Sequence, residues 1–140
     1  VSDVDLTSIL SNALENAIHA ASSVQDPKKR IIRLSMIESG DKLLISLKNT
    51  CSTPPRFEGG MPVTTEPGHG LGTQSIDYAV RKLNGNCHFS MEGEYFVLQI
   101  VLWCMICTRC KCVFAGYTWK TATGSWGSFF HTFVDTIVWT

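Results

Sequence analysis

The sequence carries no net charge, because its 12 basic residues balance 12 acidic ones. Binding driven by nucleic-acid phosphates requires an excess of Lys and Arg, so no nucleic-acid partner is expected. Long apolar runs are also missing. No signal-like segment opens the chain, and nothing before Trp103 approaches the roughly 18–20 apolar residues of a membrane span. Since the chain does not open on Met, we expect it to be a piece of a longer protein.

Regularly spaced cysteines are absent as well. Cys51 and Cys87 are isolated, whereas the other four crowd together as Cys104, Cys107, Cys110 and Cys112. This is not the framework of a disulfide-stabilised domain, so a reducing compartment is expected. A structural zinc site takes two pairs of ligands separated by a longer loop, and the crowded cysteines do not fit that spacing.

The composition changes at about residue 102. Residues 103–140 hold all four tryptophans and only one acid, Asp135, and they show no sustained helical or alternating pattern. The two parts are therefore treated separately. We expect one domain over residues 1–102, followed by an atypical Cys/Trp-rich tail. The tail is either out of frame or non-native, or it is a genuine accessory segment.

Residues 1–102 alternate helical and strand patterns. Asp5 is expected to cap a helix from about residue 6 to 23, whose apolar face is Leu6, Ile9, Leu10, Ala13, Leu14, Ala17, Ile18 and Ala21. Two alternating strands follow, at residues 32–36 and 43–48. After a long loop at 50–69, a second helix is expected from Gly70 to Asn84-Gly85, and then a hairpin of residues 87–91 and 95–102. This order predicts an α+β fold: a two-layer α/β sandwich with both helices on one face of a mixed, mainly antiparallel sheet.

Two asparagines stand four residues apart in the first predicted helix, within Asn12-Ala-Leu-Glu-Asn16. Side chains at this spacing point the same way, one turn apart. Their amide oxygens suit Mg²⁺, which takes few protein ligands. A solvated polar helix face would explain the same pair.

Two further segments carry polar or permissive residues. The run from Gly68 to Thr73 (Gly68, His69, Gly70, Leu71, Gly72 and Thr73) precedes or opens a helix, where backbone amides can bind an anion. An ordinary flexible turn would also explain it. Asn49, at the end of the second strand, can donate to and accept from an adenine edge, or it is simply a turn residue.

In this order, the three segments resemble the GHKL ATPase superfamily of gyrase, MutL and histidine kinases. The segment around Asn12 and Asn16 looks like its N box, Gly68 to Gly72 looks like its later glycine box, and Asn49-Thr50 sits where the first glycine box belongs. The motifs are most similar to bacterial sensor kinases that resemble quorum-sensing peptide receptors. The resemblance covers residues 3–102 and implies the Bergerat-type ATP-binding fold.

The resemblance also implies roles for these residues. Asn16 would bind Mg²⁺, Asn12 would lie beside the metal and the phosphates, and Asn49 would contact adenine. Residues 50–67 would form the ATP lid, and the run from Gly68 to Thr73 would hold the phosphates. His19 would lie near the phosphates.

The sequence departs from the family pattern in two places. Asn49 stands where most members have Asp, which keeps the hydrogen bonds but loses the charge. Asn12 stands where gyrase-like members have a Glu general base, so efficient hydrolysis is not expected. Phosphoryl transfer fits better, because positioning and charge stabilisation dominate that chemistry.

The implied function is the ATP-binding module of a two-component histidine kinase, located in the cytoplasmic part of a membrane receptor. Its partners would be ATP with Mg²⁺, an upstream dimerisation and phosphoacceptor domain outside this chain, and a response regulator. Two alternatives stay open: a catalytically inactive nucleotide-binding or interaction module, and a serine kinase of the anti-sigma type.

Overall fold

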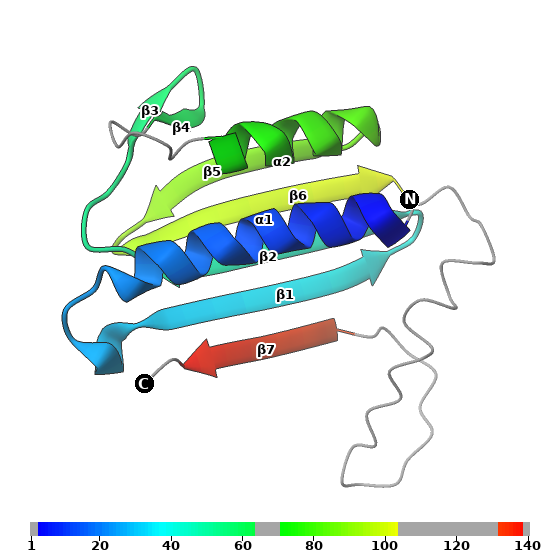
Figure 1. The fold of residues 1–140 in the computed structure, drawn as a ribbon. Helices are drawn as coiled ribbons and strands as arrows, with labels where there is room; N and C mark the ends of the chain where they lie inside the picture. The colour runs from blue at the N-terminus through cyan, green and yellow to red at the C-terminus, as the bar shows by residue number, and fades with distance from the viewer. Residues whose placement is uncertain (1–2, 64–70, 104–131, 139–140) are drawn as a thin grey trace, which may run out of the picture.

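The computed structural model describes residues 3–63, 71–103 and 132–138 (Figure 1). The helical elements are α1 (Asp3–Ser22), the short 3-10 turn η1 (Pro27–Lys29) and α2 (Leu71–Lys82). The strands are β1 (Ile31–Ser39), β2 (Lys42–Thr50), β3 (Arg56–Glu58), β4 (Met61–Val63), β5 (Asn86–Glu92), β6 (Tyr95–Trp103) and β7 (Thr132–Val138). Within these ranges, no helix is long and apolar enough to cross a membrane.

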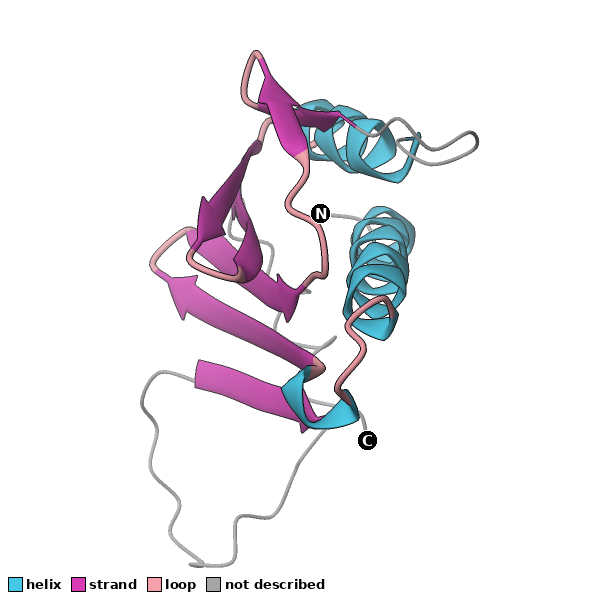
Figure 2. Ribbon diagram, turned by 90° about the vertical axis from the view of Figure 1, so that its left-hand side faces the viewer, coloured by secondary structure: helices cyan, strands magenta, loops and turns pink. Residues whose placement is uncertain are grey.

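Five strands form one sheet in the order β5-β6-β2-β1-β7, and every neighbouring pair is antiparallel. The hairpins β1–β2 and β5–β6 are the two that the alternating patterns predict. Figure 2 shows α1 and α2 side by side on one face of this sheet. The predicted two-layer sandwich is therefore confirmed.

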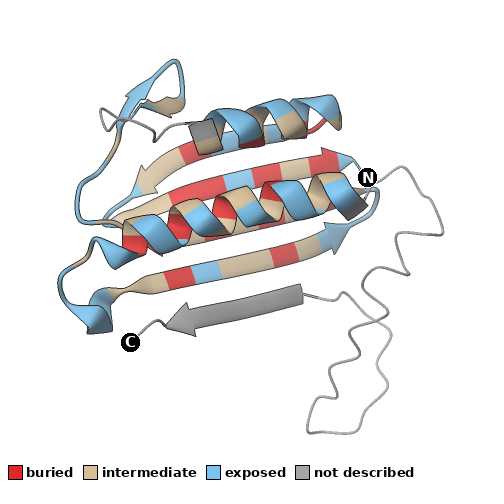
Figure 3. Cartoon of the chain, viewed as in Figure 1, coloured by how far each residue is buried: buried red, intermediate tan, exposed pale blue. Residues whose placement is uncertain are grey.

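The core lies between the helices and the sheet (Figure 3). On α1 the buried positions recur every four residues, at Ile9, Ala13, Ala17 and Ala21. Because three of them are alanines, the helix can lie close to the larger aliphatic side chains of the sheet. Ile18 was expected on this face, but it is 40% exposed and the expectation is wrong. At about 100° per residue it falls beside the alanine stripe, at the edge of the contact with the sheet, where it borders a small cavity with Ile32 of β1.

The predicted helix ends differ in accuracy. Asp5 is not a cap, because α1 already begins at Asp3; it lies in the first turn, 3.4 Å from Lys82 Nζ. Acidic residues in a first turn are stabilised by the helix dipole. Asp5 therefore does mark the start of the helix, but the helix begins a few residues earlier than predicted. The end of α2 is as expected. Asn84 has φ 55°, and the Gly85 and Asn84 amides donate to the Val80 and Arg81 carbonyls in the pattern of a Schellman motif.

Gly85 allows this helix end to pack directly on the sheet. A Cβ at this position would lie 2.6 Å from the Val101 carbonyl oxygen and 2.7 Å from Leu102 Cδ2. Both distances are far below van der Waals contact, and one of the atoms belongs to the backbone. Only glycine fits here, so the end of α2 is held at a fixed height above β6.

The segment predicted as one long loop contains a small hairpin of β3 and β4. Its turn is Gly59-Gly60, with φ values of 58° and 81°, and two positive φ angles in succession are typical of a type I′ turn. The three-residue strands are too short to produce an alternation that can be recognised in the sequence.

The tail contributes a strand that the sequence patterns did not predict. β7 pairs antiparallel with β1, with Ile31 opposite Val138 and Ile37 opposite Thr132. Residues 132–138 therefore form a strand although the tail shows no sustained alternating pattern. This stretch is rich in β-branched residues, which favour strands, although it lacks clean alternation. The four crowded cysteines lie outside the described residues.

Candidate functional site

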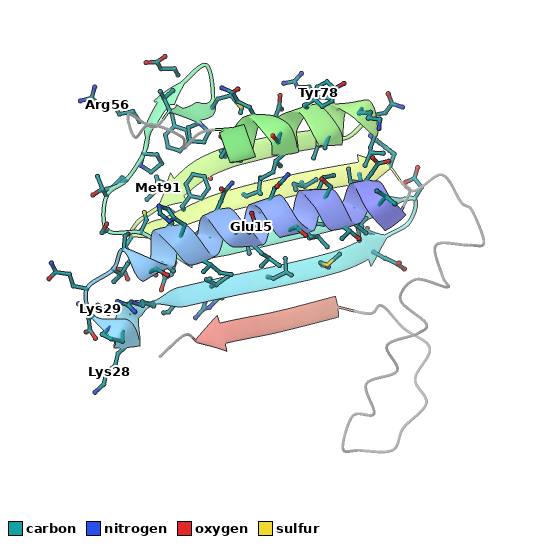
Figure 4. The ribbon with its side chains drawn as sticks, in the orientation of Figure 1. Glu15, Lys28, Lys29, Arg56, Tyr78 and Met91 are labelled. Carbon is teal, nitrogen blue, oxygen red and sulfur yellow. The ribbon has the colours of Figure 1, made fainter. Side chains whose placement is uncertain are left out.

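The two asparagines of α1 lie on the side of that helix that faces α2. Both are half-buried, so a solvated polar face does not account for them. Glu15, which stands between them in sequence, projects from the outer side of α1 into solvent (Figure 4). The helix thus separates two amides that face a neighbouring helix from a carboxylate that faces water.

Asn16 meets the first turn of α2 at Gly72. A Cβ added to Gly72 would lie 2.6 Å from both Asn16 Oδ1 and Asn16 Nδ2, and 3.0 Å from Asn16 Cγ. Only a glycine leaves room for the whole amide group at this contact. The structure therefore brings together one residue from each of two predicted motifs that are 56 positions apart in the chain.

Asn16 Nδ2 is buried and has no hydrogen-bond partner within the described part of the chain. Leaving such a group unpaired costs about 1–3 kcal/mol, and native proteins rarely tolerate it outside functional sites. Rotation about χ2 exchanges Nδ2 and Oδ1, so the same place can present either a donor or an oxygen ligand. A single amide oxygen fits Mg²⁺, which keeps most of its coordination sphere for water and phosphate oxygens.

A groove of about 490 Å³ runs between the two helices next to this contact. Its lining residues are Ser8, Asn12, Gln74, Ser75, Tyr78, Ala79 and Lys82. Asn12 is the only one of these that the sequence patterns predicted. The other polar lining residues were missed, because isolated polar residues on the outer part of an amphipathic helix give no signal until the partner helix is in place.

Asn49 lies at the end of β2, near the C-terminal end of α1 and the N-terminal end of α2 (Figure 1). It is 2% exposed, and its Nδ2 donates to the Thr50 carbonyl at 3.1 Å. Thr50 is also buried, and its hydroxyl oxygen accepts from the Ile31 amide at 3.0 Å. The last two residues of β2 therefore place a buried amide and a buried hydroxyl side by side, and both are hydrogen-bonded to the backbone.

The remaining predicted residues are placed less completely. Leu71 begins α2 and Thr73 lies in its first turn, whereas Gly68, His69 and Gly70 lie outside the described residues. His19 is exposed in the last turn of α1. The described ranges contain no group of three or more His, Cys, Asp or Glu side chains that could hold a metal ion.

Comparison with known proteins places the chain in a family. A sequence model described as the GHKL domain matches residues 1–103. The chain belongs to the GHKL domain family. None of the curated proteins matches the chain. The family assignment therefore rests on the match to the family model, whereas similar solved structures bear on the fold.

Solved structures similar to this GHKL domain include histidine kinase domains. The catalytic domain of the histidine kinase ThkA, in a nucleotide-free form, has a TM-score of 0.59 at 19% identity, over 74% of this chain and 70% of that one. The histidine kinase AdeS of Acinetobacter baumannii has 0.51 at 15%, over 72% and 46%. The blue-light activated histidine kinase of Erythrobacter litoralis has 0.51 at 18%, over 79% and 47%. The chain thus spans just under half of the latter two, and these similarities establish a shared fold.

The clearest electrostatic cluster of the GHKL domain lies away from the asparagines, where α2 meets β5. Cys87 Sγ lies 3.2 Å from Asp77 Oδ1, and Arg81 Nε donates to Asp77 Oδ2 at 2.7 Å. The Arg81 hydrogen bond lowers the pKa of Asp77. Burial, and then the Asp77 carboxylate, raise the pKa of Cys87 to about 12. This thiol is therefore protonated at neutral pH and is a poor nucleophile.

Replacing Asp77 by Asn is expected to accelerate alkylation of Cys87 by iodoacetamide several-fold at pH 8. The substitution keeps the shape but removes the negative charge, so the pKa of Cys87 falls and the thiolate fraction rises. Peptide mapping by mass spectrometry measures the rate. Cys51, whose pKa burial alone raises, is the internal reference and keeps its rate. An unchanged Cys87 rate would show that burial alone controls this thiol.

Proposed function

We propose that residues 1–102 form the ATP-binding catalytic module of a two-component histidine kinase. It would transfer the γ-phosphoryl group of ATP to a histidine on a domain outside these 140 residues. The observation that carries the proposal is the contact of Asn16 with Gly72, which joins the asparagine helix to the glycine-rich helix start in a GHKL domain. Residues 103–140 would lie outside the module, apart from Trp103, which ends β6, and the strand that β7 adds to the sheet.

Each residue would have a distinct task. Asn16 would offer its amide oxygen to Mg²⁺, Asn12 would lie beside the phosphates, and the first-turn amides of α2 would bind phosphate oxygens. Asn49 would hydrogen-bond the base from the buried end of β2. Bound Mg²⁺ and ATP would supply the phosphoryl group and neutralise the charge that develops on it.

The position of the carboxylate nearest to Asn12 in sequence favours phosphoryl transfer over hydrolysis. The nearest carboxylate in sequence, Glu15, faces solvent, so it is not placed to activate a water molecule beside the two asparagines. With Glu15 turned to solvent, that carboxylate would not promote hydrolysis, and ATP would keep its γ-phosphoryl group until an acceptor histidine arrives. In the cell, the acceptor would lie on a dimerisation domain, a response regulator would take the phosphoryl group, and the module would face the cytoplasm.

A second candidate is a nucleotide-binding module without catalysis. Asn49 motivates it, since an amide stands where most superfamily members carry a carboxylate, and its Nδ2 is already bonded to the Thr50 carbonyl. The two candidates share one binding site and differ only in whether phosphoryl transfer takes place after nucleotide binds. A serine kinase would differ in the acceptor.

Isothermal titration of the 140-residue chain with a non-hydrolysable ATP analogue tests the proposal. We expect micromolar binding with Mg²⁺ and much weaker binding without it. The chain is then incubated with ATP and a histidine-kinase acceptor domain, and acid-labile phosphorylation distinguishes histidine from serine. Binding without transfer favours the non-catalytic module, and a folded chain that binds nothing rejects both candidates.

A further inference from the structure

The small hairpin of β3 and β4 is attached to the sandwich by an aromatic contact. The Phe57 ring of β3 stacks on the Phe96 ring of β6, with centroids 6.4 Å apart and planes 16° from parallel. Phe96 in turn contacts the buried ring of Phe89, at 6.1 Å and 34°. Met61 of β4 also packs against the core. The hairpin therefore rests on a chain of three rings that ends in the core.

This contact lies beside the end of β2. In the β2–β6 register, Phe96 is directly opposite Asn49, so both side chains emerge on the face that the helices cover. Met91, on β5, is the Cα partner of Phe96 from the other side, and it lies at the same end of the sheet (Figure 4). The ring on which Phe57 rests is thus the immediate neighbour of the buried asparagine.

A second attachment lies at the base of the same segment. The Ser52 hydroxyl donates to Ser23 Oγ at 2.8 Å, and the Ser52 amide donates to the same oxygen at 3.3 Å. The chain that leaves β2 is therefore tied to the end of α1 before it reaches the hairpin. Between Ser52 and the start of α2, the contacts of Phe57 and Met61 fix where the hairpin sits.

We propose that Phe57 is a positioning residue that latches the hairpin over the Asn49 end of the sheet, and that this latch strengthens nucleotide binding. The inference rests on the proposed function and adds a residue that the motifs do not contain. Phe57 is 36% exposed, so its ring can leave Phe96 without opening the core. The interaction free energy of a partly exposed aromatic pair is small, so the contact can break. It is still large enough to favour one position of the hairpin. Docked, the hairpin rests on the Phe96 ring that lies opposite Asn49; undocked, it would leave that ring uncovered.

Three variants of the whole chain test the latch. Phe57→Ala removes the ring, and Phe57→Tyr keeps the ring while adding a hydroxyl where the side chain is already partly exposed. Val63→Ala is the matched control, because Val63 lies in the same hairpin at 38% exposure and has no ring to stack. The measurements are amide hydrogen exchange of residues 52–63 without nucleotide, affinity for the non-hydrolysable ATP analogue with Mg²⁺, and melting temperature.

Phe57→Ala is expected to speed exchange in residues 52–63 and to weaken nucleotide binding, each by about tenfold at most for the loss of one aromatic pair. Its melting temperature stays close to that of the parent, and Phe57→Tyr and Val63→Ala resemble the parent in both readouts. Three results would overturn the latch. Phe57→Ala could leave hydrogen exchange unchanged, or it could speed exchange without changing nucleotide affinity. Phe57→Tyr could also fail to keep the exchange rate and the affinity of the parent. If the parent chain binds no nucleotide, the proposed function fails, and the effect of the latch on binding fails with it. A binding defect confined to Phe57→Ala leaves the proposed function intact.

Discussion

Asn16→Ala is expected to lower Mg²⁺-dependent nucleotide affinity by at least about 100-fold, more than the loss typical of a residue that only supports a metal ligand. Alanine removes the side-chain amide that meets Gly72, and with it the proposed metal ligand. Stability should not fall in parallel. Asn16 Nδ2 has no partner among the described residues, so its removal ends a desolvation cost instead of breaking a hydrogen bond.

The measurement is isothermal titration at several Mg²⁺ concentrations, together with thermal unfolding. Asn16→Asp retains an oxygen at the same place and should retain metal-dependent binding. Glu15→Ala is the matched control on the same helix, because Glu15 faces solvent, and it should bind like the parent. If Asn16→Ala binds like Glu15→Ala, then the asparagine helix has no part in a metal site and the proposed site must be abandoned.

Most of the fold of residues 1–102 could be predicted from the sequence. The apolar periodicity of residues 1–102 predicts the two-layer sandwich, because buried positions recur every four residues on α1 and every two residues on β2. Both hairpins, both helices and the end of α2 at Asn84 follow from it. Asn16 breaks the local preference for a helix former at a half-buried position, and such breaks are where function is expected.

The features that the sequence did not reveal depend on contacts between distant segments. The latch of Phe57 requires a partner in β6, almost 40 positions away, and three-residue strands carry no readable period. Strand β7 has strand-forming residues without alternation, so its place beside β1 is visible only in the sheet. The groove beside Asn12 likewise exists only because α2 lies against α1. Local pattern predicted the elements, and tertiary packing decided which side chains meet.

Gly72→Ala is expected to abolish metal-dependent nucleotide binding while leaving the domain folded. The new Cβ would lie 2.6 Å from the two polar atoms of Asn16, and these atoms are the movable end of a side chain. Asn16 can therefore rotate away at a rotamer cost of about 0.5–1.5 kcal/mol. Alanine in a helix gains up to about 0.5–1 kcal/mol over glycine, so the two effects nearly cancel. The substitution therefore lowers nucleotide binding and not stability, because the Asn16 amide no longer occupies its place in the site.

Gly85→Ala supplies the opposite case in the same protein. Its Cβ would meet the Val101 carbonyl oxygen and Leu102 Cδ2, so the backbone of β6 or the end of α2 must move. Overpacking of this kind costs about 1–3 kcal/mol, and it lies at the far end of α2 from Gly72. Urea unfolding and nucleotide titration of the two variants should therefore give reversed results: binding lost with stability kept for Gly72→Ala, and stability lost with binding kept for Gly85→Ala. Equal loss of stability in both would mean that Gly72 serves only helix packing, and that its contact with Asn16 has no role in binding.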